Sequence, residues 1–225
     1  MPALIAITAP ALLAACGSST PKVSAPTLVQ KAKATLDATS TAHFKLTSKN
    51  VALSGTNLIG GEGDLARPAS LQGTFSVAIS GFSAKVAVVS VNGVFEAQLP
   101  FHTGYQKANP SDFGLTDPAQ LLNPDTGLTK LLSVAQNPRS GPTVRSNGEL
   151  LDTVTYTVPG SSIPVLPDTN RAQPVTVTLA INPSNYQLRT VTLVGPFTTQ
   201  KYDSTYQLTL TGYNEHVNIT LPPVS

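Results

Sequence analysis

The sequence predicts an α+β fold in which α-helices cover one face of a strongly curved antiparallel β-sheet. Three features predict it: one amphipathic helical stretch opens the body of the chain, many alternating segments follow, and a helical interval divides them into two groups. The 225 residues include 19 Pro and 16 Gly but no Trp, and the body is rich in Thr, Val, Ser and Leu. Because Pro and Gly mark turns and β-branched residues suit half-buried strands, the composition also indicates a β-rich class.

The opening helix is expected over residues 27–39. Leu28, Val29, Ala32 and Leu36 recur there at helical spacing, while polar side chains occupy the other face. The residues before it, from 17 to 26, are rich in Ser, Pro and Thr, which is typical of a flexible tether.

The first group of strands is expected between the opening helix and residue 105. Alternation predicts strands over residues 44–53, 71–79, 82–91 and 94–101, with a further short strand at Tyr105. Asn92-Gly93 predicts a tight hairpin turn between two of them. The run 82–91 is apolar on both faces, which suits a strand beside a cavity and equally suits an ordinary buried core strand.

A helical interval is expected at about residues 117–137. Asp117-Pro118 predicts a helix start, Leu128, Leu131 and Leu132 form an apolar stripe, and Asn137-Pro138 predicts the end. Strands then resume over residues 143–145, 151–158, 175–181, 188–194, 205–211 and 217–221. Since no repeat or linker follows residue 26, residues 27–225 are expected to form one domain.

Such a sheet can leave a cavity between its concave face and the helices, where apolar ligands bind. We selected the candidate wall residues by alternation and by stripe position, and the same positions would also suit a solid core. The candidates are Leu71, Phe75, Val77, Ile79, Phe82, Val86, Val88, Phe95, Leu128, Leu131 and Leu132.

The N-terminus explains the single cysteine of the chain. Residues 1–15 carry no charge and end in Leu13-Ala14-Ala15 before Cys16, which resembles the lipobox of bacterial lipoproteins. This stretch is too short to span a bilayer as a mature helix, and it predicts an export signal that is removed. Cys16 would then carry a diacylglycerol on its thiol and anchor residues 16–26 as a tether to the outer face of the plasma membrane. The alternative is an ordinary secretory signal that contains a free cysteine.

Several function classes are disfavoured by the sequence. Lys and Arg exceed Asp and Glu by only 14 to 12, without a basic cluster, which argues against a nucleic-acid partner. The three histidines lie far apart and no carboxylates or cysteines accompany them at metal-ligand spacing, so we expect no metal and no cofactor. The sequence also contains no nucleophile elbow or phosphate-binding loop, and we expect the protein not to be an enzyme.

Taken together, these features resemble the LppX/LprA/LprF/LprG lipoproteins of mycobacteria and their relatives. The likeness rests on Leu13 to Cys16, on the opening helix, on the central segment Leu122 to Pro138, and on the closing segment Tyr206 to Pro222. The resemblance implies a half-open β-barrel-like sheet around a large apolar cavity. It also implies binding of multi-acylated envelope lipids or glycolipids, such as phosphatidylinositol mannosides, and their transport or presentation outside the plasma membrane, in some members beside a membrane transporter.

The sequence therefore supports two hypotheses about function. The first is a carrier or presenter of acylated lipids in the cell envelope, and the alternative is a lipid-anchored structural or interaction module without a ligand cavity. An envelope hydrolase is a third and weaker hypothesis, because no catalytic set can be assembled from the sequence.

Overall fold

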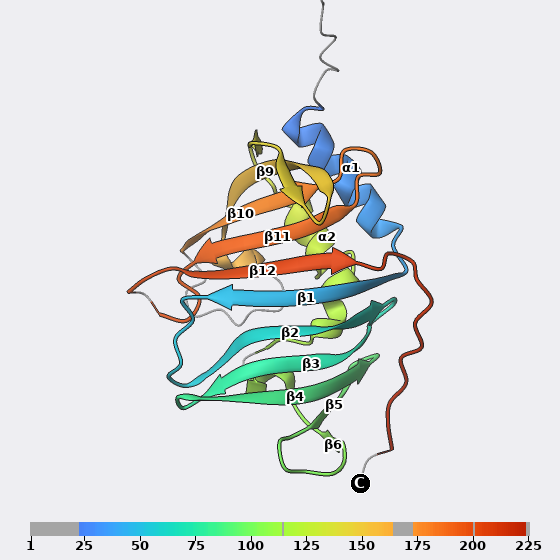
Figure 1. Cartoon of the computed structure of the whole chain (residues 1–225), viewed down its shortest axis with the longest axis vertical. Coiled ribbons are helices and arrows are strands. Elements are labelled where there is room, and N and C mark those ends of the chain that lie inside the picture. Colours follow the sequence, from blue (N-terminus) through green and yellow to red (C-terminus); the bar gives the residue numbers. More distant parts are fainter. Residues whose placement is uncertain (1–22, 114, 164–172, 200, 224–225) are drawn as a thin grey trace, which may run out of the picture.

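The computed structural model describes residues 23–113, 115–163, 173–199 and 201–223. These residues form one large antiparallel sheet with helices on one side (Figure 1). The helices of the described chain are the α-helices α1 (Ala25–Asp37) and α2 (Leu128–Ser133) and the 3-10 helices η1 (Pro110–Phe113), η2 (Pro118–Leu122) and η3 (Gly160–Ser162).

The described residues contain twelve strands. They are β1 (Thr41–Lys49), β2 (Thr56–Ala66), β3 (Ser70–Ile79), β4 (Phe82–Val91), β5 (Val94–Gln98), β6 (Gln106–Lys107), β7 (Arg139–Ser140), β8 (Val144–Ser146), β9 (Glu149–Pro159), β10 (Pro174–Ile181), β11 (Leu188–Gly195) and β12 (Ser204–Thr211). Their order across the sheet is β6-β5-β4-β3-β2-β1-β12-β11-β10-β9-β7, and β8 pairs with β9 beside this path. The sheet is thus an unclosed antiparallel sheet, which confirms the expected fold class.

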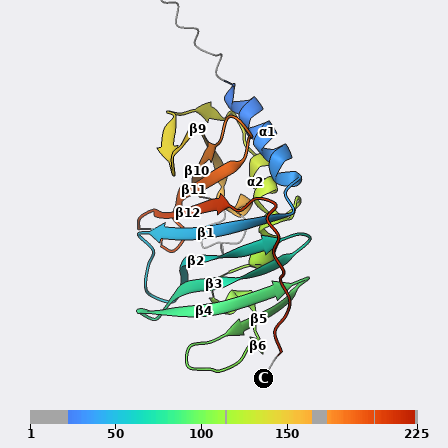
Figure 2. The same ribbon diagram turned by 45° about the vertical axis from the view of Figure 1, so that its right-hand side comes forward.

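The pairing of β1 with β12 joins two meanders into this one sheet. One meander runs from β1 to β6 and the other from β7 to β12, and the first and last strands pair antiparallel from His43↔Thr211 to Lys49↔Thr205. The chain therefore leaves one edge of the sheet at β6 and must return at the opposite edge at β7. The segment between these edges, residues 108–138, carries η1, η2 and α2 across the inner face, and we call it the crossover (Figures 1 and 2).

Alternation separates the two faces of the sheet. In β1, Ala42 and Phe44 are buried on the inner face, while Lys45 and Thr47 are exposed on the outer face. Strand β12 follows the same rule with Tyr206, Leu208 and Leu210 buried. The crossover lies against the inner face, where η2 contacts β2, β3 and β4, and α2 contacts both η2 and α1. The core therefore lies between the sheet and these helices.

Glycines allow close approach where β2 pairs with β3. A Cβ atom on Gly63 would lie 2.1 Å from the carbonyl oxygen of Gln72, and one on Gly61 would lie 2.6 Å from the Phe75 ring. The Phe75 ring in turn stacks on Phe44 of β1 with ring centroids 5.8 Å apart. Gly61 thus makes room for the aromatic rings on the inner face, and Gly63 allows the two strand backbones to approach closely.

Helix α1 begins at Ala25, two residues before the expected start, so residues 25 and 26 of the expected tether belong to the helix. Ser24 is the N-cap, and its hydroxyl accepts a hydrogen bond from the amide of Thr27 at 3.4 Å. At the other end, the guanidinium of Arg67 donates to the carbonyl of Leu36 in the last turn and to that of Thr39 just beyond the helix. The expected signal segment and Cys16 lie outside the described residues.

The strands of the structure differ from the predicted ones in several places. Strand β2 was not predicted, because Gly60, Gly61 and Gly63 interrupt the apolar alternation within it. The expected first strand ends at Lys49 and not near residue 55, and the strand expected over residues 94–101 ends at Gln98. Residues 217–221 are extended but pair with no strand of the described chain, and the tail instead runs along the ends of the strands (Figures 1 and 2).

The close approach at Gly63 gives a stability prediction. Among the residues that the structure describes, the buried apolar core lies between Ala25 and Leu210, so a polypeptide of residues 23–225 contains this core and is expected to fold alone. In this polypeptide, Gly63→Ala should lower the free energy of unfolding by about 2 kcal/mol, because the added methyl collides with backbone. Gly60→Ala is the matched control, since its Cβ would lie 3.2 Å from the Leu46 carbonyl oxygen and should have a smaller effect. Urea unfolding measures both, and equal stabilities for wild type and Gly63→Ala would contradict the prediction.

Candidate functional site

An apolar pocket lies between the crossover and the central strands, and we call it the inner pocket. Its lining side chains are apolar except for one tyrosine hydroxyl, and they come from β1, β2, β3, β11, β12, η2 and α2. They are Phe44, Leu46, Leu58, Phe75, Pro118, Leu121, Leu128, Leu131, Val191, Leu193, Tyr206 and Leu208. An arrangement of this kind offers burial to hydrocarbon and almost no polar contacts.

The one hydroxyl in the lining is already satisfied by the protein. Tyr206 donates a hydrogen bond to the carbonyl of Leu58 at 2.8 Å, and its ring packs edge-on against Phe197 at 5.4 Å between centroids. Burial raises the pKa of the Tyr206 hydroxyl well above its usual range, so the group stays neutral. The inner pocket is therefore uncharged as well as apolar.

The inner pocket is narrow in this structure. About 50 Å³ of it is open to the centre of a water molecule, in a region whose unfilled space totals about 540 Å³. A single water needs about 10–15 Å³ by the first measure, and ligand sites usually measure about 300–1,000 Å³. The pocket as it stands thus has room for a few water molecules, and a large ligand would have to widen it.

The structure places the eleven sequence-selected wall residues in three different settings. Phe75, Leu128 and Leu131 line the inner pocket. Six others are buried in the same core but do not line the pocket: Leu71, Val77, Val86, Val88, Phe95 and Leu132.

The last two selected residues, Ile79 and Phe82, do not line the inner pocket. They are 41% and 80% exposed at the tip of the β3–β4 hairpin. By alternation they continue the inner rows of β3 and β4, but the helices of the crossover do not extend over them. The alternation of apolar residues identified the correct face of each strand, but it could not show how far along the strand the crossover extends.

Sequence reasoning missed most of the pocket. Four of its twelve lining residues come from β1 and β12, whose pairing brings Phe44 and Leu46 beside Leu208 and Tyr206. Alternation in both segments was visible in the sequence, but nothing local shows that strands some 160 residues apart are neighbours. Predicting that Tyr206 and Phe44 line one pocket therefore requires the order of the strands in the sheet.

The histidine and carboxylates of the outer face form one polar cluster. His43 Nδ1 lies 2.8 Å from Asp64 Oδ1 and His43 Nε2 lies 3.3 Å from Glu62 Oε1, while Lys45 lies 3.5 Å from Glu62. Burial alone would lower the pKa of His43, but hydrogen bonds and charges from both carboxylates outweigh it and raise the pKa. The cluster lies on the face opposite the inner pocket and is a set of ion pairs across β1 and β2.

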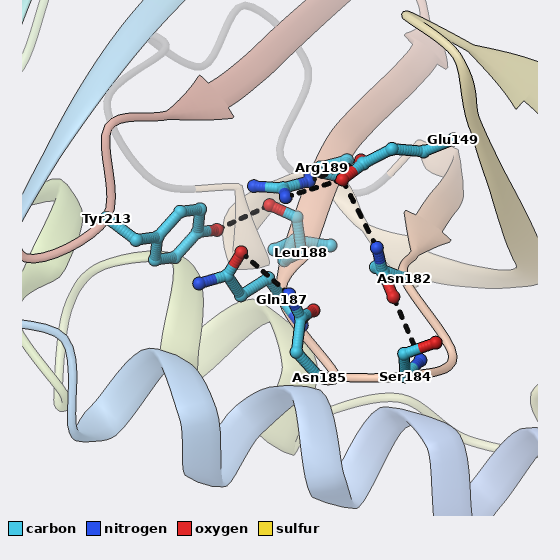
Figure 3. Close-up of polar contacts among 8 residues, drawn as sticks. All are labelled: Glu149, Asn182, Ser184, Asn185, Gln187, Leu188, Arg189 and Tyr213. Atoms are coloured by element: carbon cyan, nitrogen blue, oxygen red, sulfur yellow. Dashed lines mark hydrogen bonds and ion pairs between the residues drawn. The ribbon is translucent and has the colours of Figure 1, made fainter.

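A second polar cluster joins the β10–β11 turn to its neighbours (Figure 3). Arg189 donates two hydrogen bonds to Glu149, at 2.7 and 2.8 Å, and Asn182 donates to the same carboxylate at 3.3 Å. The hydrogen bonds and the charge of Arg189 lower the pKa of Glu149 despite some burial. Tyr213 donates to the Leu188 carbonyl, which fixes the start of the C-terminal tail. The charges of Arg189 and Glu149 are paired with each other, so we interpret this cluster as stabilising the fold.

The described residues offer no group of three metal-ligating side chains. In the same part of the chain, no helix is long and apolar enough to cross a bilayer. The inner pocket is the candidate site, because its lining is almost wholly apolar.

Residues 24–219 match the model of the LppX_LprAFG lipoprotein family. The chain belongs to this family. The family resemblance stated from the sequence is thus confirmed over nearly the whole described chain. Membership also accounts for the architecture, since an unclosed antiparallel sheet with few helices is the fold of its solved members.

Relatives in this family include proteins with an assigned role. The chain is 29% identical to the lipoarabinomannan carrier protein LprG of Mycobacterium bovis BCG over 95% of this chain and 91% of that protein, and equally to LprG of Mycobacterium tuberculosis. The crystal structure of LprF from Mycobacterium bovis superposes with a TM-score of 0.70 at 17% identity, covering 88% of this chain and 96% of LprF. LppX of Mycobacterium tuberculosis gives a TM-score of 0.55 at 20% identity, covering 87% of this chain and 99% of LppX.

The outer-face cluster gives a prediction for pH dependence. Since the pKa of folded His43 lies above the unfolded value of 6.5, its ion pairs stabilise the fold fully below pH 6.5 and are lost as the pH rises through the folded pKa. The free energy of unfolding should therefore fall more between pH 5.5 and 8.5 in the wild type than in His43→Gln. The difference should stay under about 1 kcal/mol, because exposed pairs contribute little. Denaturant unfolding at the two pH values measures it, and identical pH profiles for the two proteins would refute the prediction.

Proposed function

We propose that this protein is an envelope lipoprotein that binds acylated lipids or glycolipids in the inner pocket and carries or presents them outside the plasma membrane. In this role no bond is made or broken, and the protein needs no metal or cofactor. The named role of the LprG relatives supports the proposal, as does family membership over residues 24–219. The observation that carries it is the inner pocket itself, with its almost wholly apolar lining.

Physical chemistry explains why such a lipid needs an enclosed site. An acyl chain of roughly 14 methylenes costs about 11 kcal/mol to expose to water, at about 0.8 kcal/mol for each methylene. A lipid with several chains multiplies this cost, and a flat surface patch covers too little of each chain to offset it. A carrier must therefore surround the chains with apolar side chains and leave the polar headgroup in water.

The proposed site has to widen, and the crossover is the part that can move. The strands below it are fixed by ladders of backbone hydrogen bonds, but the crossover rests on the sheet mainly through apolar side chains. Its polar attachments include the bond from Tyr156 to the Leu131 carbonyl at 3.2 Å and the bond from Ser90 to Asp117 at 3.0 Å. Displacing the crossover exchanges contacts with side chains for contacts with acyl chains and leaves the strand pairing intact.

The proposal includes attachment to the membrane through Cys16. A diacylglycerol on this thiol would supply two acyl chains, which is what durable anchoring requires. The mature domain would then stand on a short polar tether at the outer face of the plasma membrane, where it could meet a membrane transporter that delivers or receives lipid.

A second candidate function is a lipid-anchored structural or interaction module that holds no lipid inside. The small free volume of the inner pocket, about 50 Å³ for water centres, favours this alternative. The two candidates differ in what the purified domain contains. A carrier isolated from a host with related envelope lipids brings lipid with it, and a structural module does not.

The proposal predicts that filling the inner pocket expels bound lipid. Leu193→Trp places a larger side chain in the lining, while Thr192→Trp on the outer face of the same strand is the matched control. If the indole displaces roughly two methylenes at about 0.8 kcal/mol each, lipid binding should weaken about tenfold. Both variants of residues 23–225 would be purified from a mycobacterial host, and the lipid for each mole of protein would be quantified by mass spectrometry after organic extraction. Equal lipid content in both variants, or none in the wild type, would contradict a lipid site in this pocket.

A further inference from the structure

Exposed apolar side chains gather at one end of the sheet. The described residues include nine large apolar side chains that are exposed, and five of them lie in or beside the loops at this end: Leu53, Ile79, Phe82, Phe101 and Tyr202. We call this part of the molecule the open end. It consists of the β1–β2 loop, the β3–β4 turn, the β5–β6 loop and the β11–β12 loop, which lie at the left-hand ends of the strands in Figure 1.

Two of these side chains are exposed to an unusual degree. Phe82 is 80% exposed at the start of β4, and Phe101 is fully exposed in the loop that follows β5. Strand β5 runs antiparallel to β4 and ends at Gln98, opposite Ala87, so the chain leaves the sheet towards the end where β4 begins. Exposed apolar side chains that gather in one region, unlike singly scattered ones, indicate a contact surface.

Hydrogen bonds connect three loops of the open end: the β1–β2 loop, the β3–β4 turn and the β11–β12 loop. The amides of Ser80 and Gly81 in the β3–β4 turn each donate a hydrogen bond of 2.8 Å to the β1–β2 loop, to the carbonyls of Gly55 and Leu53. The exposed side chains of Leu53, Ile79 and Phe82 therefore project from backbone segments that are hydrogen-bonded to each other.

The β1–β2 loop is fastened in the same way to the β11–β12 loop. The Ala52 amide donates to the Thr198 hydroxyl at 3.0 Å, and the Ser204 hydroxyl donates to the Asn50 carbonyl at 2.8 Å. Tyr202 therefore lies in a loop that is hydrogen-bonded to the rest of the open end. Because these three loops are already hydrogen-bonded to one another, they lose little further conformational entropy when they contact a partner.

The open end is also positively charged. Lys49 and Lys201 are exposed at or next to its loops, and Lys85 is exposed on β4, three residues after Phe82. Asp203 is the one acidic residue in the described parts of these loops. Three lysines against one aspartate leave a net positive charge. Exposed apolar side chains among lysines are what an anionic lipid surface binds, because the rings enter the headgroup region while the ammonium groups contact phosphates.

The inner pocket reaches the open end. Among its lining residues, Leu58 lies two residues into β2, Tyr206 lies two residues into β12, and Leu193 lies two residues before the end of β11. The inner rows of β3 and β4 continue outward from the covered core to Ile79 and Phe82. The pocket lining and these inner rows thus both extend towards the open end of the sheet.

We propose that the open end docks the protein on an anionic lipid bilayer, with Phe82 and its exposed apolar neighbours in the headgroup region and the lysines on lipid phosphates. This inference rests on the proposed function, since docking in this orientation places the pocket against the membrane from which acyl chains enter or leave. A chain could then pass between bilayer and protein without crossing water, which avoids the cost of exposing it.

The absence of tryptophan from the sequence allows a direct test. Phe82→Trp in residues 23–225 places a single fluorophore at the open end, and Leu150→Trp places one at an exposed position on β9, outside the open end, as the control. With vesicles of phosphatidylcholine and phosphatidylglycerol, the emission of Phe82→Trp should shift to shorter wavelength, and that of Leu150→Trp should not. No shift at Phe82→Trp, or equal shifts for both variants, would overturn the proposal.

A charge reversal tests the electrostatic part. Lys85→Glu should weaken binding to these vesicles at least about fivefold, because each basic residue near an anionic surface contributes about that factor. Arg145→Glu changes the net charge by the same amount in β8, outside the open end, and should leave binding unchanged. Equal losses for the two variants would contradict docking by the open end, as would equally tight binding of the wild type to vesicles of phosphatidylcholine alone.

The result also separates this inference from the proposed function. Lipid extracted from the purified domain reports on the inner pocket and needs no vesicle. A domain that contains lipid but shows no response at Phe82→Trp would refute docking by the open end and leave the carrier function supported. A domain that docks but contains no lipid would refute the carrier function.

Discussion

The pairing of β1 with β12 is the constraint on which the rest of this structure depends. Because the first and last strands meet at the centre of the sheet, the two edges belong to the middle of the chain, and the segment that connects them has to cross the inner face. The crossover is therefore a cover that the topology imposes. The same pairing places Phe44 and Leu46 beside Tyr206 and Leu208, so the strands that hold the sheet together also form the floor of the inner pocket.

The crossover covers the inner pocket and the strands form its floor, and different interactions hold these two parts in place. This difference connects the fold to the proposed function. The floor is a ladder of backbone hydrogen bonds, closely packed at Gly63 and stacked with Phe44 and Phe75. The cover consists of short helical segments that rest on apolar side chains, and hydrocarbon can replace such contacts at little cost. A narrow pocket in the unliganded protein is consistent with this, since an empty apolar hollow of several hundred cubic ångströms would leave many side chains without contacts.

Much of the fold could be predicted from local sequence, and the parts that could not have identifiable causes. The α1 periodicity, the bounds of β4 and the Asn92-Gly93 turn were correct because each is specified by a few neighbouring residues. Strand β2 was missed because its glycines serve close backbone approach and carry no alternation. Ile79 and Phe82 were assigned to the correct face of their strands, but their exposure depends on where the crossover lies, which is a property of distant residues.

The central claim is that acyl chains occupy the space between the crossover and the floor formed by β1 and β12. A crystal structure of residues 23–225, purified with lipid from a mycobacterial host, tests it most directly. The account predicts continuous acyl-chain density between Leu131 and Tyr206, with the crossover displaced and the strand pairing unchanged. Lipid bound elsewhere on the molecule, or a pocket as narrow as the present one in lipid-loaded protein, would contradict it.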